Sequence, residues 1–163
     1  MVVLHERARD TGLGEAPLVP GLREEAAVVE KAWRGDPPTV LLVEDEDSVR
    51  RVIHKFLERE GYQLLEARNA EEAEDIARVY EEPIHILVTD VMMPGMTGPE
   101  LAERLARLRP DMKVLFVSGY RHDTLEHEGL LLGQVNLLPK PFPASELLRR
   151  VQLLLAHQRP LAH

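Results

Sequence analysis

The sequence predicts an α/β fold in which five parallel strands form a central sheet and five helices cover its two faces. From residue 39 onward, short apolar, β-branched runs alternate with helical stretches, which is typical of repeated βαβ units. Several of these runs are apolar throughout, as expected of strands that are buried on both faces. In addition, polar residues suited to chemistry come just after the strands, where the sites of such sheets lie.

The expected elements define one domain over residues 39–157, followed by a tail at 158–163. The strands are expected at Thr39–Val43, Tyr62–Glu66, Ile84–Thr89, Lys113–Ser118 and Val135–Leu138. The helices are expected at Asp47–Glu60, Ala70–Glu81, Gly98–Leu108, His122–Leu131 and Ala144–His157.

Residues 1–38 form an arm that contains several Pro and Gly residues and no strand pattern. One short helix is compatible with it, because Leu22, Ala26, Val29 and Trp33 fall on one helical stripe. Two interpretations are open: a loosely docked helix in a mobile arm, or a helix that binds a partner or forms a homodimer.

Composition excludes several classes of function. The chain of 163 residues has no Cys, which excludes disulfides and thiolate chemistry. Its formal charge of −8 argues against direct nucleic-acid binding, because a basic surface for phosphates is missing. No apolar run approaches the length of a membrane span, and the N-terminus does not resemble a secretory signal. We therefore expect no membrane contact and a cytoplasmic location.

Three carboxylates are expected to converge where two strands end, namely those of Glu44, Asp45 and Asp90. At 4 Å and an effective dielectric constant near 20, each pair of like charges costs about 4 kcal/mol. Such a cluster requires a bound cation or an added proton. Oxygen ligands without nearby Cys or His favour Mg²⁺ over zinc.

A magnesium site of this kind indicates phosphoryl transfer, in which positioning and charge neutralisation supply most of the catalysis. Asp90 is the best-placed nucleophile, because it lies between a buried strand and the turn that follows. Lys140 and Ser118 follow two other strands and could bind the phosphoryl oxygens. Each residue also has a structural interpretation: Asp47 as a helix N-cap, Asp90 as a turn residue and Lys140 as a surface charge.

Four motifs with their order and spacing resemble the receiver domains of bacterial response regulators, proteins of two-component signalling. The resemblance covers roughly residues 38–155 and is closest to receivers of hybrid histidine kinases. The motifs are Thr39–Asp47 (TVLLVEDED), Leu87–Gly98 (LVTDVMMPGMTG), Val117–Tyr120 (VSGY) and Leu138–Phe142 (LPKPF).

The resemblance implies a flavodoxin-like fold with strand order 2-1-3-4-5 and phosphorylation from a histidine kinase or a histidine phosphotransfer domain. It implies a signalling module that catalyses only its own phosphorylation and dephosphorylation, with Mg²⁺ or Mn²⁺ as cofactor. The roles it implies are Asp90 as phosphoacceptor and metal ligand, Asp45 as direct metal ligand, Glu44 as a ligand through water, Met92 as a ligand through its backbone carbonyl, Ser118 as switch hydroxyl and Lys140 as phosphate-binding lysine, with a cis peptide before Pro141.

Two features bear on the switch and on the lifetime of the phosphorylated state. Leu137 stands where the family often has an aromatic residue, so a switch that rotates an aromatic ring is not expected. The resemblance implies that Met92 and Tyr120 flank the approach of the hydrolytic water, and neither side chain is an acid or amide that could orient it. We therefore expect slow self-dephosphorylation.

Alternatives concern the class of protein and its setting. A haloacid-dehalogenase-like phosphatase also uses an aspartyl nucleophile, and a pseudo-receiver would only bind partners. The few residues after the last helix favour a stand-alone receiver, a phosphorelay intermediate or the tail of a hybrid kinase. The helix expected first in the domain should dock a helical partner with whichever of Val49, Ile53, Phe56 and Leu57 do not face the sheet.

Overall fold

Five parallel strands form the central sheet, in the order β2-β1-β3-β4-β5, which confirms the predicted fold and strand order. The computed structural model describes residues 35–119 and 136–156. The strands in these ranges are β1 (Thr39–Val43), β2 (Gln63–Ala67), β3 (Ile86–Asp90), β4 (Lys113–Ser118) and β5 (Leu137–Pro139).

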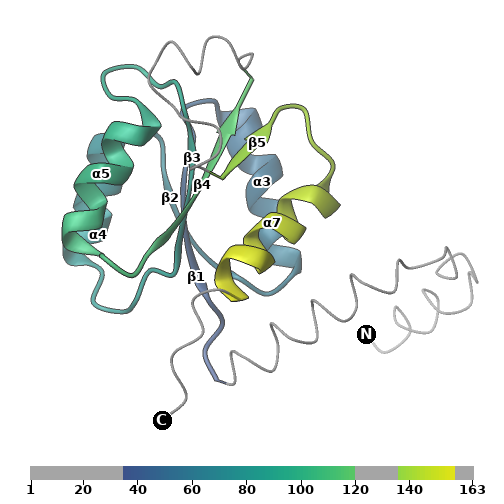
Figure 1. Ribbon diagram of the computed structural model, residues 1–163, viewed down its shortest axis with the longest axis horizontal. Coiled ribbons are helices and arrows are strands. Elements are labelled where there is room, and N and C mark those ends of the chain that lie inside the picture. The colour runs from purple at the N-terminus through teal and green to yellow at the C-terminus, as the bar shows by residue number, and fades with distance from the viewer. Residues whose placement is uncertain (1–34, 120–135, 157–163) are drawn as a thin grey trace, which may run out of the picture.

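Helices cover both faces of the sheet (Figure 1). Helices α3 (Asp47–Arg59) and α7 (Ala144–Ala156) lie on one face, and α4 (Ala70–Val79) and α5 (Gly98–Leu108) lie on the other. The helices expected at 122–131 and within 22–33 lie outside the described residues, as does the tail. In the described part of the chain, no helix has the length and apolar character needed to cross a bilayer.

Strand β1 contributes side chains to two separate cores. Val40 and Leu42 pack with residues of α3 and α7, whereas Leu41 and Val43 pack with residues of α4 and α5. All four side chains are fully buried. A slip of one residue would exchange the two cores, so this packing fixes the register of β1 and the place where the residues after it emerge.

Two predicted details near α3 are wrong. The strand expected to begin at Tyr62 begins one residue later, because the Tyr62 N–H donates to the Leu57 carbonyl at the end of α3 (3.3 Å). Asp47 is the first residue of α3 and not its N-cap; the N-cap is Glu46, which has extended backbone angles. The Asp47 carboxylate instead accepts a hydrogen bond from Arg50 at 2.6 Å, so it pairs with a side chain and leaves the helix N–H groups uncapped.

The first residue of α5 touches the backbone at the end of β3. The Gly98 N–H donates to the Val91 carbonyl (2.7 Å). A Cβ at Gly98 would lie 2.2 Å from the carbonyl oxygen of Asp90. Thr97 and Glu100 form a capping box that starts the helix at this position. Close approach of two backbones therefore requires glycine here, and α5 is held directly against Asp90.

Replacing Gly98 with Ala should destabilise the protein. The added methyl group would overlap the Asp90 carbonyl, and overpacking of this kind costs about 1–3 kcal/mol. Urea unfolding of the parent and variant measures the difference. Gly119→Ala is the matched control, because a Cβ there meets nothing within 4 Å. Equal stability of the Gly98→Ala variant and the parent would show that the loop before α5 gives way without cost.

Candidate functional site

Polar side chains from four strand ends meet at the carboxyl edge of the sheet. Glu44 follows β1, Asp90 ends β3, Ser118 ends β4 and Lys140 follows β5. Glu44, Asp90 and Ser118 are 1%, 8% and 1% exposed. Carboxylates are rarely buried this deeply unless they are paired, so their surroundings decide what this edge can do.

The carboxylates of Glu44, Asp45 and Asp90 form one acidic cluster, as the sequence predicts. Each contributes an oxygen, and these atoms all lie within 4.8 Å of one another. Glu44 and Asp90 are buried, whereas Asp45 is exposed. An all-oxygen donor set with an open side fits Mg²⁺ or Mn²⁺, which keep waters and substrate oxygens among their ligands.

Lys140 balances part of the buried negative charge. Its ammonium lies 3.1 Å from a Glu44 oxygen and 3.1 Å from an Asp90 oxygen. The cis peptide expected between Lys140 and Pro141 is present. The sequence analysis assigned Lys140 to the phosphoryl group alone; its pairing with both acids is a finding of the structure.

Burial and charge shift the protonation of this cluster. Desolvation and then the nearby Asp90 carboxylate raise the pKa of Glu44 to about 7, although Lys140 opposes them. Burial acts to lower the pKa of Lys140, but the carboxylates of Asp90 and Glu44 outweigh it and raise that pKa. Glu44 therefore takes up a proton near neutral pH.

The Asp90 side chain and backbone are both held in place. One carboxylate oxygen accepts the Met92 N–H (3.3 Å), while the other faces Lys140. The hydroxyl of buried Thr89 donates to the Asp90 carbonyl (3.0 Å). Because each oxygen has a different partner, the carboxylate has one fixed orientation toward the edge of the sheet.

For the other residues singled out in the sequence, the structure gives burial or a backbone contact, or does not describe the residue. Met92 is half-buried beside Asp90, and the Lys140 N–H donates to the Ser118 carbonyl (2.7 Å). Tyr120 lies outside the described residues. Leu137 is half-buried, and its carbonyl accepts a hydrogen bond from Arg150 (2.6 Å). The functional roles assigned to all of these residues stay predictions.

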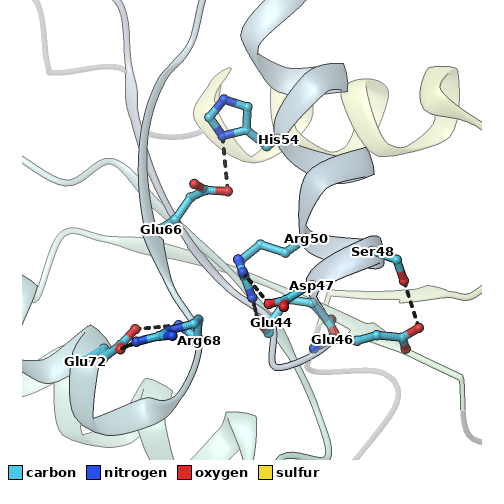
Figure 2. A network of polar contacts seen from close by, with 9 residues as sticks. All are labelled: Glu44, Glu46, Asp47, Ser48, Arg50, His54, Glu66, Arg68 and Glu72. Carbon is cyan, nitrogen blue, oxygen red and sulfur yellow. Dashed lines mark hydrogen bonds and ion pairs between the residues drawn. The ribbon is translucent and has the colours of Figure 1, made fainter.

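Arg50 was missed by the sequence analysis. Figure 2 shows its side chain reaching back from α3 toward Asp47 and Glu44. It donates to the Glu44 carbonyl at 2.9 Å and to Asp47 at 2.6 Å. The spacing of Asp47 and Arg50, three residues apart on a helix, was the one signal of this contact in the sequence.

A shallow apolar groove of about 310 Å³ lies beside Lys140, between α3 and the loop that follows β5. Of the α3 residues expected to form a surface, Ile53 and Leu57 are buried, and Val49 and Phe56 are half-buried. The loop residues were not anticipated as part of this surface. The groove is lined by Ser48, Val49, Val52, Ile53, Phe56, Lys140, Pro141 and Phe142.

The protonation of Glu44 should make the metal-free protein more stable at lower pH. Between its ordinary pKa of 4.5 and about 7, the folded protein holds a proton that the unfolded chain has released. The free energy of unfolding should therefore rise as pH falls through this window, by at most about 1.4 kcal/mol per pH unit.

Urea unfolding in the presence of a chelator, at several pH values, measures this slope. Glu44→Gln is the comparison, because it removes this titration and keeps the size and shape of the side chain. The difference in stability between parent and variant should change with pH. Parallel curves for the two proteins would contradict the raised pKa of Glu44.

Comparison with known proteins identifies the family to which these features belong. The family model for the response regulator receiver domain matches residues 40–152. The sensor kinase CckA of Brucella abortus is 40% identical over 120 residues, which are 74% of this chain and 13% of the kinase. The response regulator receiver protein CpdR of the same organism is 34% identical over 116 residues, which are 71% of this chain and 95% of CpdR.

A solved structure agrees in both sequence and fold. The crystal structure of the receiver domain from the hybrid histidine kinase CckA is 38% identical, with a TM-score of 0.61 over 72% of this chain and 98% of that one. The matched span includes the acidic cluster, the Ser118 strand end and Lys140. The chain therefore belongs to the response regulator receiver domain family of two-component signalling, a family of signalling modules, and resembles the receivers of hybrid histidine kinases.

Proposed function

We propose that Asp90 accepts a phosphoryl group from a phosphohistidine partner in a reaction that depends on a divalent metal. The observation that supports this most strongly is the buried Asp90 carboxylate, set between Lys140 and two further carboxylates at the edge of the sheet. The phosphorylated domain then relays the signal through a conformational change or a protein contact. The chain thus acts as a signalling module, and the only reactions it catalyses are its own phosphorylation and dephosphorylation.

In the transfer step, an Asp90 oxygen forms a bond to phosphorus while the bond between phosphorus and the donor histidine nitrogen breaks. The imidazole leaves with the electron pair of that bond. The Met92 N–H and Lys140 hold the two Asp90 oxygens in a fixed orientation before the reaction. Lys140 and the Ser118 hydroxyl are then positioned to bind the incoming phosphoryl oxygens.

The metal site supplies charge neutralisation for the attack of one anion on another. We propose that Asp45, Asp90 and the Met92 carbonyl would hold Mg²⁺ or Mn²⁺ directly, with Glu44 acting through a water molecule. The proximity of the three carboxylates supports this assignment.

Hydrolysis of the aspartyl phosphate should be slow. Met92 is half-buried beside Asp90 and offers no acid or amide to orient a water molecule. Tyr120 is expected to act in the same way. A long-lived phosphorylated state suits a sustained signal or a reversible relay, and a homodimer formed through the arm remains a separate prediction.

With Mg²⁺ and acetyl phosphate, the protein should gain one phosphoryl group, and Asp90→Asn should abolish that gain. Intact-mass spectrometry measures the addition directly. Asp75→Asn is the matched control, because this acid lies on α4 with its side chain 69% exposed. Labelling of the Asp90→Asn variant to the level of the parent would place the acceptor elsewhere.

The groove beside Lys140 is the surface where we propose that the phosphohistidine partner docks. It adjoins the acceptor site, and its lining is mostly apolar, which suits the exposed face of a partner helix. Val52 lies in the groove and is 48% exposed, so a charge there would alter the surface without entering the core.

Val52→Glu should slow phosphotransfer from a histidine phosphotransfer domain by about tenfold or more, a loss expected when a charge enters an apolar contact. Labelling by acetyl phosphate should be unchanged. Val79→Glu is the matched control, since Val79 is 75% exposed and lies on α4. An equal loss with both donors would show damage to the site itself, and unchanged transfer from the protein donor would place docking elsewhere.

A further inference from the structure

Arg50 makes a contact whose purpose the proposed function leaves unexplained. It lies in α3, and its side chain is only 13% exposed although it is charged. The guanidinium turns back along the helix and donates to the Glu44 carbonyl (2.9 Å), while Asp47 accepts a second hydrogen bond from it (2.6 Å) (Figure 2). Asp47 is 62% exposed, and this hydrogen bond is the first cause that lowers its pKa.

The peptide that receives this contact joins the two acids of the β1–α3 loop, Glu44 and Asp45. In the preceding peptide, between Val43 and Glu44, the Glu44 N–H donates to the Ala67 carbonyl (3.2 Å). On the loop side, the Glu44 carbonyl accepts the hydrogen bond from Arg50. The main chain of Glu44 is therefore held from both sides, once by the sheet and once by α3.

Asp45 has no comparable anchor of its own. Its side chain is exposed, and within residues 35–119 and 136–156 no hydrogen bond or ion pair holds it. The position of the Asp45 carboxylate therefore depends on the backbone conformation of the loop. Two side chains hold this backbone: the Glu44 carboxylate accepts the Glu46 N–H on one side of Asp45 (3.3 Å), and Arg50 donates to the carbonyl of the preceding residue on the other.

We propose that Arg50 is a positioning residue for the divalent cation site. By fixing the peptide between Glu44 and Asp45, Arg50 sets the direction in which the Asp45 carboxylate points. This inference rests on the metal dependence of the proposed function. Asp47 holds the guanidinium in the required orientation and compensates its charge. Arg50 itself does not touch the cation.

If Arg50 acts only through its charge, its removal should change Mg²⁺ affinity in one direction. If it acts by positioning Asp45, its removal should change Mg²⁺ affinity in the opposite direction. A positive charge close to a cation site repels the cation, so its removal should strengthen Mg²⁺ binding if charge alone matters. If Arg50 instead positions Asp45, its removal should weaken Mg²⁺ binding even though a repulsive charge is lost. The sign of the change distinguishes the two roles.

The experiment compares Mg²⁺ dissociation constants of the parent and Arg50→Met by isothermal titration calorimetry. Met keeps an unbranched apolar stem and removes the N–H donors. We expect the dissociation constant to rise about tenfold, the scale set by the loss of a hydrogen bond from a charged donor. Arg50→Lys, which retains a charge and a donor, should recover part of the loss. At saturating Mg²⁺, labelling of Asp90 by acetyl phosphate should return toward the parent rate.

Arg51→Met is the matched control, because Arg51 is the exposed neighbour in the same helix and, among the described residues, makes no side-chain hydrogen bond or ion pair. Its charge also acts on Asp47, so the control removes a similar positive charge. It should bind Mg²⁺ as tightly as the parent or more tightly. Amide hydrogen exchange at Asp45 and Glu46 in the metal-free protein should be faster in Arg50→Met than in Arg51→Met. This comparison tests whether Arg50 holds the loop, independently of metal binding.

Equal or tighter Mg²⁺ binding by Arg50→Met would overturn the positioning role. If that variant does not fold, Arg50→Gln decides, because it removes the charge and shortens the reach toward the Glu44 carbonyl, and binding as tight as that of the parent or tighter would also overturn the proposal. Failure of the parent to bind Mg²⁺ is a different result, because it would contradict the proposed metal dependence rather than the role of Arg50.

Discussion

The structure depends on how negative charge is kept at the carboxyl edge of an apolar sheet. Glu44 and Asp90 are almost inaccessible to water, and burial of two carboxylates costs several kcal/mol per ion unless a partner compensates. Lys140 places one positive charge beside both carboxylates. The raised pKa of Glu44 also lets that group take up a proton, which removes one of the two negative charges. A bound divalent cation would supply a third means of compensation. The edge is therefore a site whose charge balance depends on what occupies it.

Backbone contacts hold this unfavourable arrangement in place. The double-sided burial of β1 fixes where Glu44 emerges, and Arg50 fixes the carbonyl that follows. At β3, the Thr89 hydroxyl and the close approach of Gly98 fix the Asp90 peptide. These contacts use carbonyl oxygens and therefore hold the backbone, whereas the carboxylates of Glu44 and Asp90 are bound separately, by Lys140. Such a division suits a site that must change its ligands without changing its fold.

The arrangement also separates the chemistry from the choice of partner. The acidic cluster and Lys140 belong to strand ends, whereas the apolar groove belongs to α3 and the loop after β5. Lys140 is the residue that both have in common. Under the proposed function, a change on the helix surface would alter the partner and leave the phosphoacceptor chemistry intact, which is the property expected of a module shared by many signalling pathways.

The sequence by itself determined the fold class and the convergence of Glu44, Asp45, Asp90 and Lys140, because alternating apolar runs specify a parallel sheet and such a sheet brings its carboxyl ends together. The strand order followed from the resemblance of its motifs to receiver domains. It misplaced the start of β2 and the cap of α3, which depend on single hydrogen bonds that leave no periodic signal. Only the tertiary structure revealed Lys140 between two acids, Arg50 on the Glu44 carbonyl and Gly98 against Asp90. The physical reason is that these contacts are set by how closely different elements approach one another in space, whereas sequence patterns report only which face of an element is buried.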